Sequence, residues 1–350
     1  MTSRLRRIDW IAVNGPKHIS WGMKPVLVAA LAIVFLASAP AHATSLSITP
    51  TFDSSITGDP NAAAIEAVIT QAINLYQASF SDPINVSIKF QEGGGLGGSN
   101  TTLYKISYQN FINALVADSS SANDAVALSH LPTGANNPVT GSTTINVKTA
   151  NLKALGFNGA SFPPIGGFDG IITLNTNLTD IGSAGTTGQY SLSAVVEHEI
   201  DEVLGLGSDL PGGGTNGFFN DPAAEDLFRY TGAGNGTRSY TTSGDDAWFS
   251  IDGTTNLARF NQGSINNNGG DYGDWWSNNG GGNGIPGSPT PQVQDAFATA
   301  GSHPTLGVEL TALDAIGYNF SNTNPVPEPS TMVLFGTTLV AIARLKLRRK

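Results

Sequence analysis

The stretch Ser191-Leu-Ser-Ala-Val-Val-Glu-His-Glu-Ile-Asp-Glu-Val-Leu-Gly205 has the pattern of an amphipathic helix. Its apolar residues recur at the spacing of one helical face. They are Leu192, Val195, Val196, Val203 and Leu206. Glycine is favoured just past a helix end, because it tolerates the backbone conformation needed there. We therefore predict a helix that ends near Gly205 and organises the fold around it.

Three side chains on this helix have the residue types of a metal site. His198 and Glu202 are four residues apart, so they lie on one face, and Glu199 stands beside them. Two ligands one turn apart, with a glutamate able to act as general base, is the arrangement of a zinc-protease helix. We take His198 and Glu202 as metal ligands and Glu199 as the catalytic residue. We expect Asp201 to face solvent.

This segment resembles the H-E-x-x-H-x-x-G motif of the zincin metalloproteases, and more closely that of the metzincin-like branch, with Glu202 at the second histidine. The resemblance implies an α+β fold in which a small mixed sheet packs on helices, including the active-site helix, followed by a loop-rich C-terminal lobe. Residues 169–175 resemble the edge strand that lines the substrate cleft in that group. Residues 226–230 and 313–318 resemble a family of metalloprotease-like proteins that often end in PEP-CTERM tails.

The third metal ligand is less clearly marked. The metzincin position falls on Ser208, a poor zinc ligand, and Asp209 is one residue off. Asp226 lies where glutamate-type zincins recruit a downstream acid, so the resemblance favours Asp226. His130 and His303 are further candidates in loops. No methionine occurs between Met23 and Met332, so the Met-turn of the metzincins is missing.

The N-terminal segment has the features of a secretory signal peptide. Lys24 precedes an apolar run over residues 25–37, and Ala41-His42-Ala43 forms a small-residue cleavage site. We predict that residues 1–43 are removed on export, with either Met1 or Met23 as the start.

The C-terminal segment is organised in three parts. Residues 321–330 form a linker containing Pro327-Glu328-Pro329, and residues 331–350 form a hydrophobic anchor with a basic tail. The basic tail would stay cytoplasmic. This resembles the PEP-CTERM sorting signal, which implies cleavage by an exosortase; an ordinary tail anchor is the alternative. We expect a protein on the outer surface or in the extracellular matrix of a Gram-negative bacterium, transiently anchored in the inner membrane.

Composition excludes several classes of function. Between residues 44 and 330, seven Lys and Arg face 26 Asp and Glu, a net charge of −19. Such a chain repels nucleic acid and anionic lipid and attracts cations. Since the chain has no cysteine, disulfides, thiol catalysis and cysteine-bound metals are excluded.

Periodicity along the exported region predicts an α+β lobe over 44–205 and a loop-rich lobe over 206–320. We expect helices over 59–77, 108–117, 149–155 and 306–316, strands over 84–91, 170–175, 238–242 and 247–251, and a glycine-rich turn over 93–98.

These observations favour a secreted zinc metallopeptidase acting on protein or peptide substrates. A non-catalytic surface or matrix protein on a protease-like scaffold is the alternative. Calcium is a further candidate metal at Asp245-Asp246, Asp252-Gly253 and residues 271–274, although turns explain these loops more simply. Trp275 and Trp276 suit the core, or a sugar-stacking surface if exposed.

Overall fold

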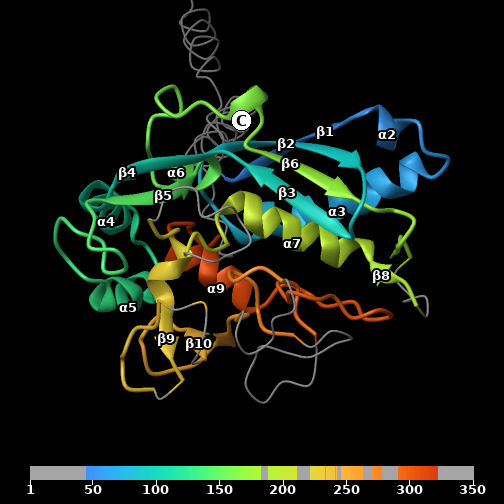
Figure 1. Ribbon diagram of the computed structural model, residues 1–350. Coiled ribbons are helices and arrows are strands. Elements are labelled where there is room, and N and C mark those ends of the chain that lie inside the picture. Colours follow the sequence, from blue (N-terminus) through green and yellow to red (C-terminus); the bar gives the residue numbers. More distant parts are fainter. Residues whose placement is uncertain are drawn as a thin grey trace, which may run out of the picture. The chain divides into compact units, whose positions relative to one another are not determined.

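The computed structural model describes residues 45–182, 188–210, 221–232, 234–240, 242, 246–262, 270–277 and 291–321 (Figure 1). The predicted signal peptide and sorting anchor lie outside these residues. Within the described ranges, no helix has the length and apolar character needed to cross a membrane.

A four-stranded mixed sheet forms the upper layer in Figure 1. Its strands are β1 (Ser47–Phe52), β2 (Asn85–Glu92), β6 (Gly170–Leu174) and β3 (Gly97–Thr101), in that spatial order. β1, β2 and β6 run parallel, while β3 pairs antiparallel with β6 in the register Gly97↔Leu174. The mixed α+β class predicted from the sequence is confirmed.

The edge of this sheet differs from the sequence prediction. Residues 169–175 were expected to form the edge strand, but β6 lies inside the sheet, between β2 and β3. The edge is β3, most of which falls in or beside the segment expected to be a glycine-rich turn. Glycines are depleted in strands, so propensity alone argues against β3, and its pairing with β6 overrides that preference.

Two helices pack together against the sheet. They are α3 (Ala62–Ser79), which follows the short α2 (Ser54–Thr57), and α7 (Leu192–Leu204). Figure 1 shows both on the same side of the sheet. The apolar stripe of α3 is buried, and the Tyr76 hydroxyl donates a hydrogen bond of 2.7 Å to the Glu197 carbonyl of α7. The helices predicted over 59–77 and up to Gly205 are confirmed.

Several smaller elements flank the sheet. β4 (Leu103–Ser107) pairs antiparallel with β5 (Thr144–Lys148), and β7 (Thr179–Asp180) pairs with β8 (Tyr190–Ser191). The helices here are α4 (Tyr108–Asp118), α5 (Ala122–His130), α6 (Thr149–Ala154) and the 3-10 turn η1 (Ile165–Gly167). The predicted helices over 108–117 and 149–155 therefore match α4 and α6.

The described residues after Gly205 contain few regular elements. A 3-10 turn η2 (Glu225–Phe228) leads into a small sheet of β9 (Arg229–Thr231), β10 (Ala247–Phe249) and β11 (Ala258–Arg259), and α9 (Val308–Ala315) is the last helix of the described residues. The strand predicted over 238–242 is wrong, since Arg238 makes an isolated bridge to Tyr230. Leu204, Phe228 and Ile316 enter one hydrophobic core, so residues on both sides of Gly205 stabilise each other.

Candidate metal centre and cleft

Helix α7 is fixed at both ends. The Ser191 side chain accepts a hydrogen bond from the Ala194 amide, which caps the first turn. At the other end Gly205 has φ +153°, and a Cβ there would lie 2.6 Å from Cδ1 of Ile316. The Tyr318 hydroxyl also donates to the Leu204 carbonyl at 2.8 Å. These contacts set the direction in which the polar face of α7 points.

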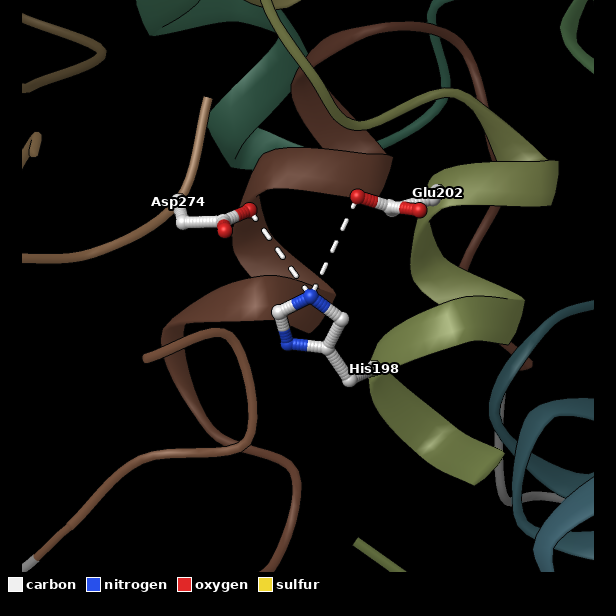
Figure 2. A group of neighbouring side chains, drawn as sticks. All are labelled: His198, Glu202 and Asp274. Atoms are coloured by element: carbon white, nitrogen blue, oxygen red, sulfur yellow. Dashed lines mark ion pairs between the residues drawn. The ribbon is translucent and has the colours of Figure 1, made fainter. Parts of the chain in front are cut away.

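His198 and Glu202 point from this face toward Asp274 (Figure 2). One ligand atom from each of the three side chains lies within 4.8 Å of the others. Nε2 of His198 is 3.9 Å from Oε1 of Glu202 and 3.8 Å from Oδ1 of Asp274. Such distances are too long for hydrogen bonds. The three groups therefore face a common point, and a protonated His198 forms ion pairs with both carboxylates (Figure 2).

Each of the three side chains is oriented by a second partner. Nδ1 of His198 lies 3.0 Å from the Val293 carbonyl, which can only accept, so Nδ1 carries the proton and the lone pair of a neutral ring is at Nε2. The Ser99 hydroxyl donates to Oε2 of Glu202 at 2.5 Å, leaving Oε1 toward His198. The Gln294 amide donates to Oδ1 of Asp274 at 3.0 Å.

Beside this group lies a cleft of about 830 Å³. It is lined by β3, by residues of α7 that include His198, Glu199 and Glu202, and by residues 292–293 and 295–299. Glu199 lines the cleft as well; it is 5% exposed, and its Oε2 has no hydrogen-bond partner. The predicted catalytic glutamate is thus a buried carboxyl group in the wall of the cleft.

The electrostatics of the group shift three pKa values upward. Burial lowers the pKa of His198, but the charges of Asp274, Glu199 and Glu202 outweigh it and raise the pKa to about 10. Burial, with added repulsion from Glu202, raises the pKa of Glu199 to about 9. Burial also raises the pKa of Asp274 to about 8, although His198 opposes the shift. Protons held this way are exchangeable for a metal cation.

The donor set fits zinc. Imidazole nitrogen and carboxylate oxygen are both ordinary zinc ligands. Two carboxylate oxygens turned toward the same imidazole nitrogen need a proton or cation between them to offset their repulsion. The hydrogen bond to Val293 also presents the histidine in the tautomer that binds metal through Nε2.

Asp226, predicted as the third ligand, lies outside this group. It is buried, and its oxygens accept hydrogen bonds from the Ser208 hydroxyl at 2.7 Å and from the amides of Asp209 and Ala223. Its carboxylate therefore links residues 208–209 to residue 223, just before η2. In the structure Asp274 is the second carboxylate that meets His198.

Asp201 also differs from its prediction. The sequence predicts that it faces solvent, but it is 0% exposed and points from α7 toward Tyr76 of α3 and Glu309 of α9. Burial, with the charge of Glu309, raises its pKa well above the usual range. The face of α7 opposite the cleft has a polar sequence, but α3 and α9 cover it.

The remaining candidates are not drawn into the centre. His130 is an exposed residue whose Nδ1 contacts the Val126 carbonyl within α5, and His303 is also exposed. Asp252 accepts the amides of Thr254 and Thr255, as a turn residue does. Asp245 lies outside the described residues. Trp275 is fully buried, which confirms its place in the core.

Sequence reasoning missed Asp274 and Ser99. Asp274 lies in the run 271–274, which was read as a turn or a calcium loop. The tryptophan pair directly after it is a signal, since Trp275 favours the core and Asp274 is buried beside it. Nothing in the sequence marks Ser99 as part of the site, because its hydrogen bond to Glu202 requires that residues 97–101 form strand β3.

Comparison with known protein families gives a match at the C-terminal end of the chain. Residues 325–350 match the family model of the PEP-CTERM protein-sorting motif. No curated protein and no solved structure matches the chain. The motif indicates export and sorting to the cell surface, and it implies recognition by an exosortase-type enzyme. The chain therefore carries a PEP-CTERM protein-sorting motif, as its proline-rich and basic segments predicted.

Proposed function

We propose that this protein is a zinc-dependent peptidase of the zincin type, acting outside the inner membrane of a Gram-negative bacterium. The observation that carries the proposal is the meeting of His198, Glu202 and Asp274 at the wall of a cleft that Glu199 also lines. Export and sorting by the PEP-CTERM motif would bring the site to substrates outside the cell.

The ligands would be Nε2 of His198 and one carboxylate oxygen each of Glu202 and Asp274. Zinc bound by them supplies a Lewis acid that polarises a peptide carbonyl and acidifies water. Two carboxylates neutralise more of the zinc charge than the usual histidine-rich set, so we expect a weaker Lewis acid than a two-histidine site.

Glu199 would move the proton in hydrolysis. Glu199 lines the cleft beside the three ligands. A bound cation would replace the proton that burial and Glu202 hold on it, and the resulting carboxylate would accept the proton of the attacking water. The same carboxyl would then protonate the departing amine, which completes peptide cleavage without a second acid.

Strand β3 would hold the substrate. One edge of β3 pairs with β6, and residues 96–103 line the cleft along the rest of the strand. An extended peptide can add to such an edge through main-chain hydrogen bonds. Its scissile bond would then run beside α7, past Glu199 and His198.

Glu199→Gln tests this function. The amide keeps the size of the side chain but cannot accept the proton, so we expect peptide cleavage to fall by about 10²–10⁴-fold while zinc binding is retained. Glu66→Gln on α3, away from the cleft lining, is the matched control and should cleave at the wild-type rate.

Cleavage undiminished in Glu199→Gln would contradict the role of Glu199. A wild-type protein that binds zinc yet cleaves no peptide in a diverse library would instead support the alternative of a non-catalytic surface protein.

A further inference from the structure

The metal centre needs two stretches of chain to meet. One is the turn after α7, at residues 205–209, and the other is residues 270–277, which carry Asp274. Their backbones are in direct contact, because a Cβ at Gly273 would lie 2.6 Å from the carbonyl carbon of Gly207. Glycine has no Cβ and so allows this approach. The position of Asp274 relative to α7 therefore depends on what holds these two stretches together.

Arg229, the first residue of β9, holds the stretch that carries Asp274. Its Nη1 donates a hydrogen bond of 2.7 Å to the Tyr272 carbonyl, two residues before Asp274. The side chain is 0% exposed, and its guanidinium carbon lies 4.1 Å from the ring centroid of Phe260. Nε and Nη2 have no hydrogen-bond partner among the described residues. The bond to the Tyr272 carbonyl is therefore the contact that orients this buried guanidinium.

Two buried acids of η2, directly before β9, hold the turn after α7. Oε2 of Glu225 accepts a hydrogen bond of 2.5 Å from the Gly207 amide. The carboxylate of Asp226 accepts the Ser208 hydroxyl at 2.7 Å and the Asp209 amide at 3.0 Å. One short segment, η2 with the start of β9, is thus bonded to both stretches that form the metal centre.

The charges of these three side chains depend on each other. A buried guanidinium is costly without opposite charge nearby. Burial lowers the pKa of Arg229, and the charges of Asp226 and Glu225 oppose that shift. Burial raises the pKa of Asp226 to about 6, and the charge of Arg229 opposes that shift in turn. Loss of Arg229 would leave two buried acids without their cation.

We propose that Arg229 is a positioning residue of the metal centre, which through the Tyr272 carbonyl sets where Asp274 meets His198. This inference rests on the proposed zinc site and deepens it, because Arg229 neither belongs to the three-ligand group nor lines the cleft. Asp226, which the sequence predicted as a ligand, then acts on the centre indirectly, as a charge partner of Arg229.

Arg229→Met tests the proposal, because methionine keeps an apolar side chain in the core but removes the donor and the charge. We expect the zinc Kd, measured by competition with a chelator, to rise about 10–100-fold, as for loss of an outer partner of a ligand. The visible spectrum of the Co²⁺-loaded protein, which reports ligand geometry, should change as well. Arg229→Lys keeps the charge and a donor and should recover part of the affinity.

Arg238→Met is the matched control. Arg238 also donates to backbone carbonyls, those of Leu227 and His130, but not to residues 270–277. Its loss should lower the free energy of unfolding, measured in urea, and leave the zinc Kd and the Co²⁺ spectrum unchanged. This comparison separates positioning of the centre from a general contribution to stability.

Gly273→Ala tests the same positioning without removing a charge, and it decides the matter if Arg229→Met does not fold. Its Cβ would displace residues 270–277 from Gly207, so we expect a similar rise in the zinc Kd and a changed Co²⁺ spectrum. Gly94→Ala is the control, because a Cβ at Gly94 meets nothing within 4 Å.

The outcomes distinguish this inference from the peptidase function. A zinc Kd and a Co²⁺ spectrum unchanged in Gly273→Ala and in folded Arg229→Met would overturn the positioning role and leave the zinc site standing. An equal rise in Kd in Arg238→Met would also overturn it. The expected changes in a protein whose wild type cleaves no peptide would support the positioning role and overturn the peptidase function.

Discussion

Ser99 determines which oxygen of Glu202 faces His198. Its hydroxyl donates to Oε2 at 2.5 Å, and Oε1 is left 3.9 Å from Nε2 of His198. Removing this donor frees the carboxylate to rotate. We therefore expect Ser99→Ala to weaken zinc binding by about 10–100-fold, as loss of an outer partner typically does. Titration with a competing chelator measures this, with Ser79→Ala on α3 as control.

A zinc affinity unchanged in Ser99→Ala would show that Glu202 is positioned by α7 alone. It would also leave the short contact between these residues without a role in the metal centre.

At the same scale, the sequence predicted the site in part. His198, Glu199 and Glu202 follow from helical spacing, which fixes side chains on one face whatever packs against them. Asp274 does not, because its approach depends on how residues 270–277 cross the cleft. Asp201 shows the same limit: its charge suggested solvent, while its burial depends on α9, more than a hundred residues along the chain.

At the scale of elements, the packing of β3 on α7 positions the proposed base. Gly97 packs directly against Glu199: a Cβ there would press on Oε1 of Glu199 and approach Cγ1 of Val195 to 2.7 Å. Gly97→Ala should therefore displace the Glu199 carboxylate and lower turnover at least about ten-fold, since small misplacements of reacting groups are costly. Steady-state kinetics on the zinc-loaded protein measures this effect.

Gly98→Ala is the matched control for this prediction, because a Cβ at Gly98 meets nothing within 4 Å. Equal losses of turnover in the two variants would indicate that alanine harms the strand generally and would contradict a specific role for Gly97.

Helices and strands with a strong hydrophobic periodicity were predicted well. A strand whose conformation depends on pairing with another strand was not. Helices α3, α4 and α7 each have a clear apolar stripe, and strand β2 alternates between buried side chains and side chains that are less buried. Strand β3 has the sequence Gly-Gly-Ser-Asn-Thr, which carries no such pattern. Its conformation comes from hydrogen bonds to β6, which no local signal announces.

At the scale of the whole molecule, the last described residues pack against the segment that follows α3 and against the end of α4. The amide of Asn319 donates to Asp82 at 3.0 Å, and its side chain donates to Asp118 at 3.0 Å. Burial, and the charge of Asp118, raise the pKa of Asp82 to about 6 even though hydrogen bonds from Asn319 oppose the shift. The unfolded chain should ionise near 3.8 instead.

This shift predicts a pH-dependent stability. Between pH 4 and 6 the folded protein holds a proton on Asp82 that the unfolded chain has lost, so the free energy of unfolding falls as pH rises. The loss attributable to Asp82 is at most about 3 kcal/mol and is complete above its folded pKa. Urea unfolding at several pH values should show a smaller decline in Asp82→Asn, which cannot ionise. An identical decline in both proteins would contradict this account.

The most direct measurement of the metal centre is the zinc content of purified wild-type protein and three variants. We predict about one zinc per chain in the wild type, in keeping with a single three-ligand protein site. Zinc should be lost in His198→Ala and Asp274→Ala and retained in Asp226→Asn. No zinc in the wild type after reconstitution, or zinc retained in Asp274→Ala but lost in Asp226→Asn, would contradict the centre described by the structure.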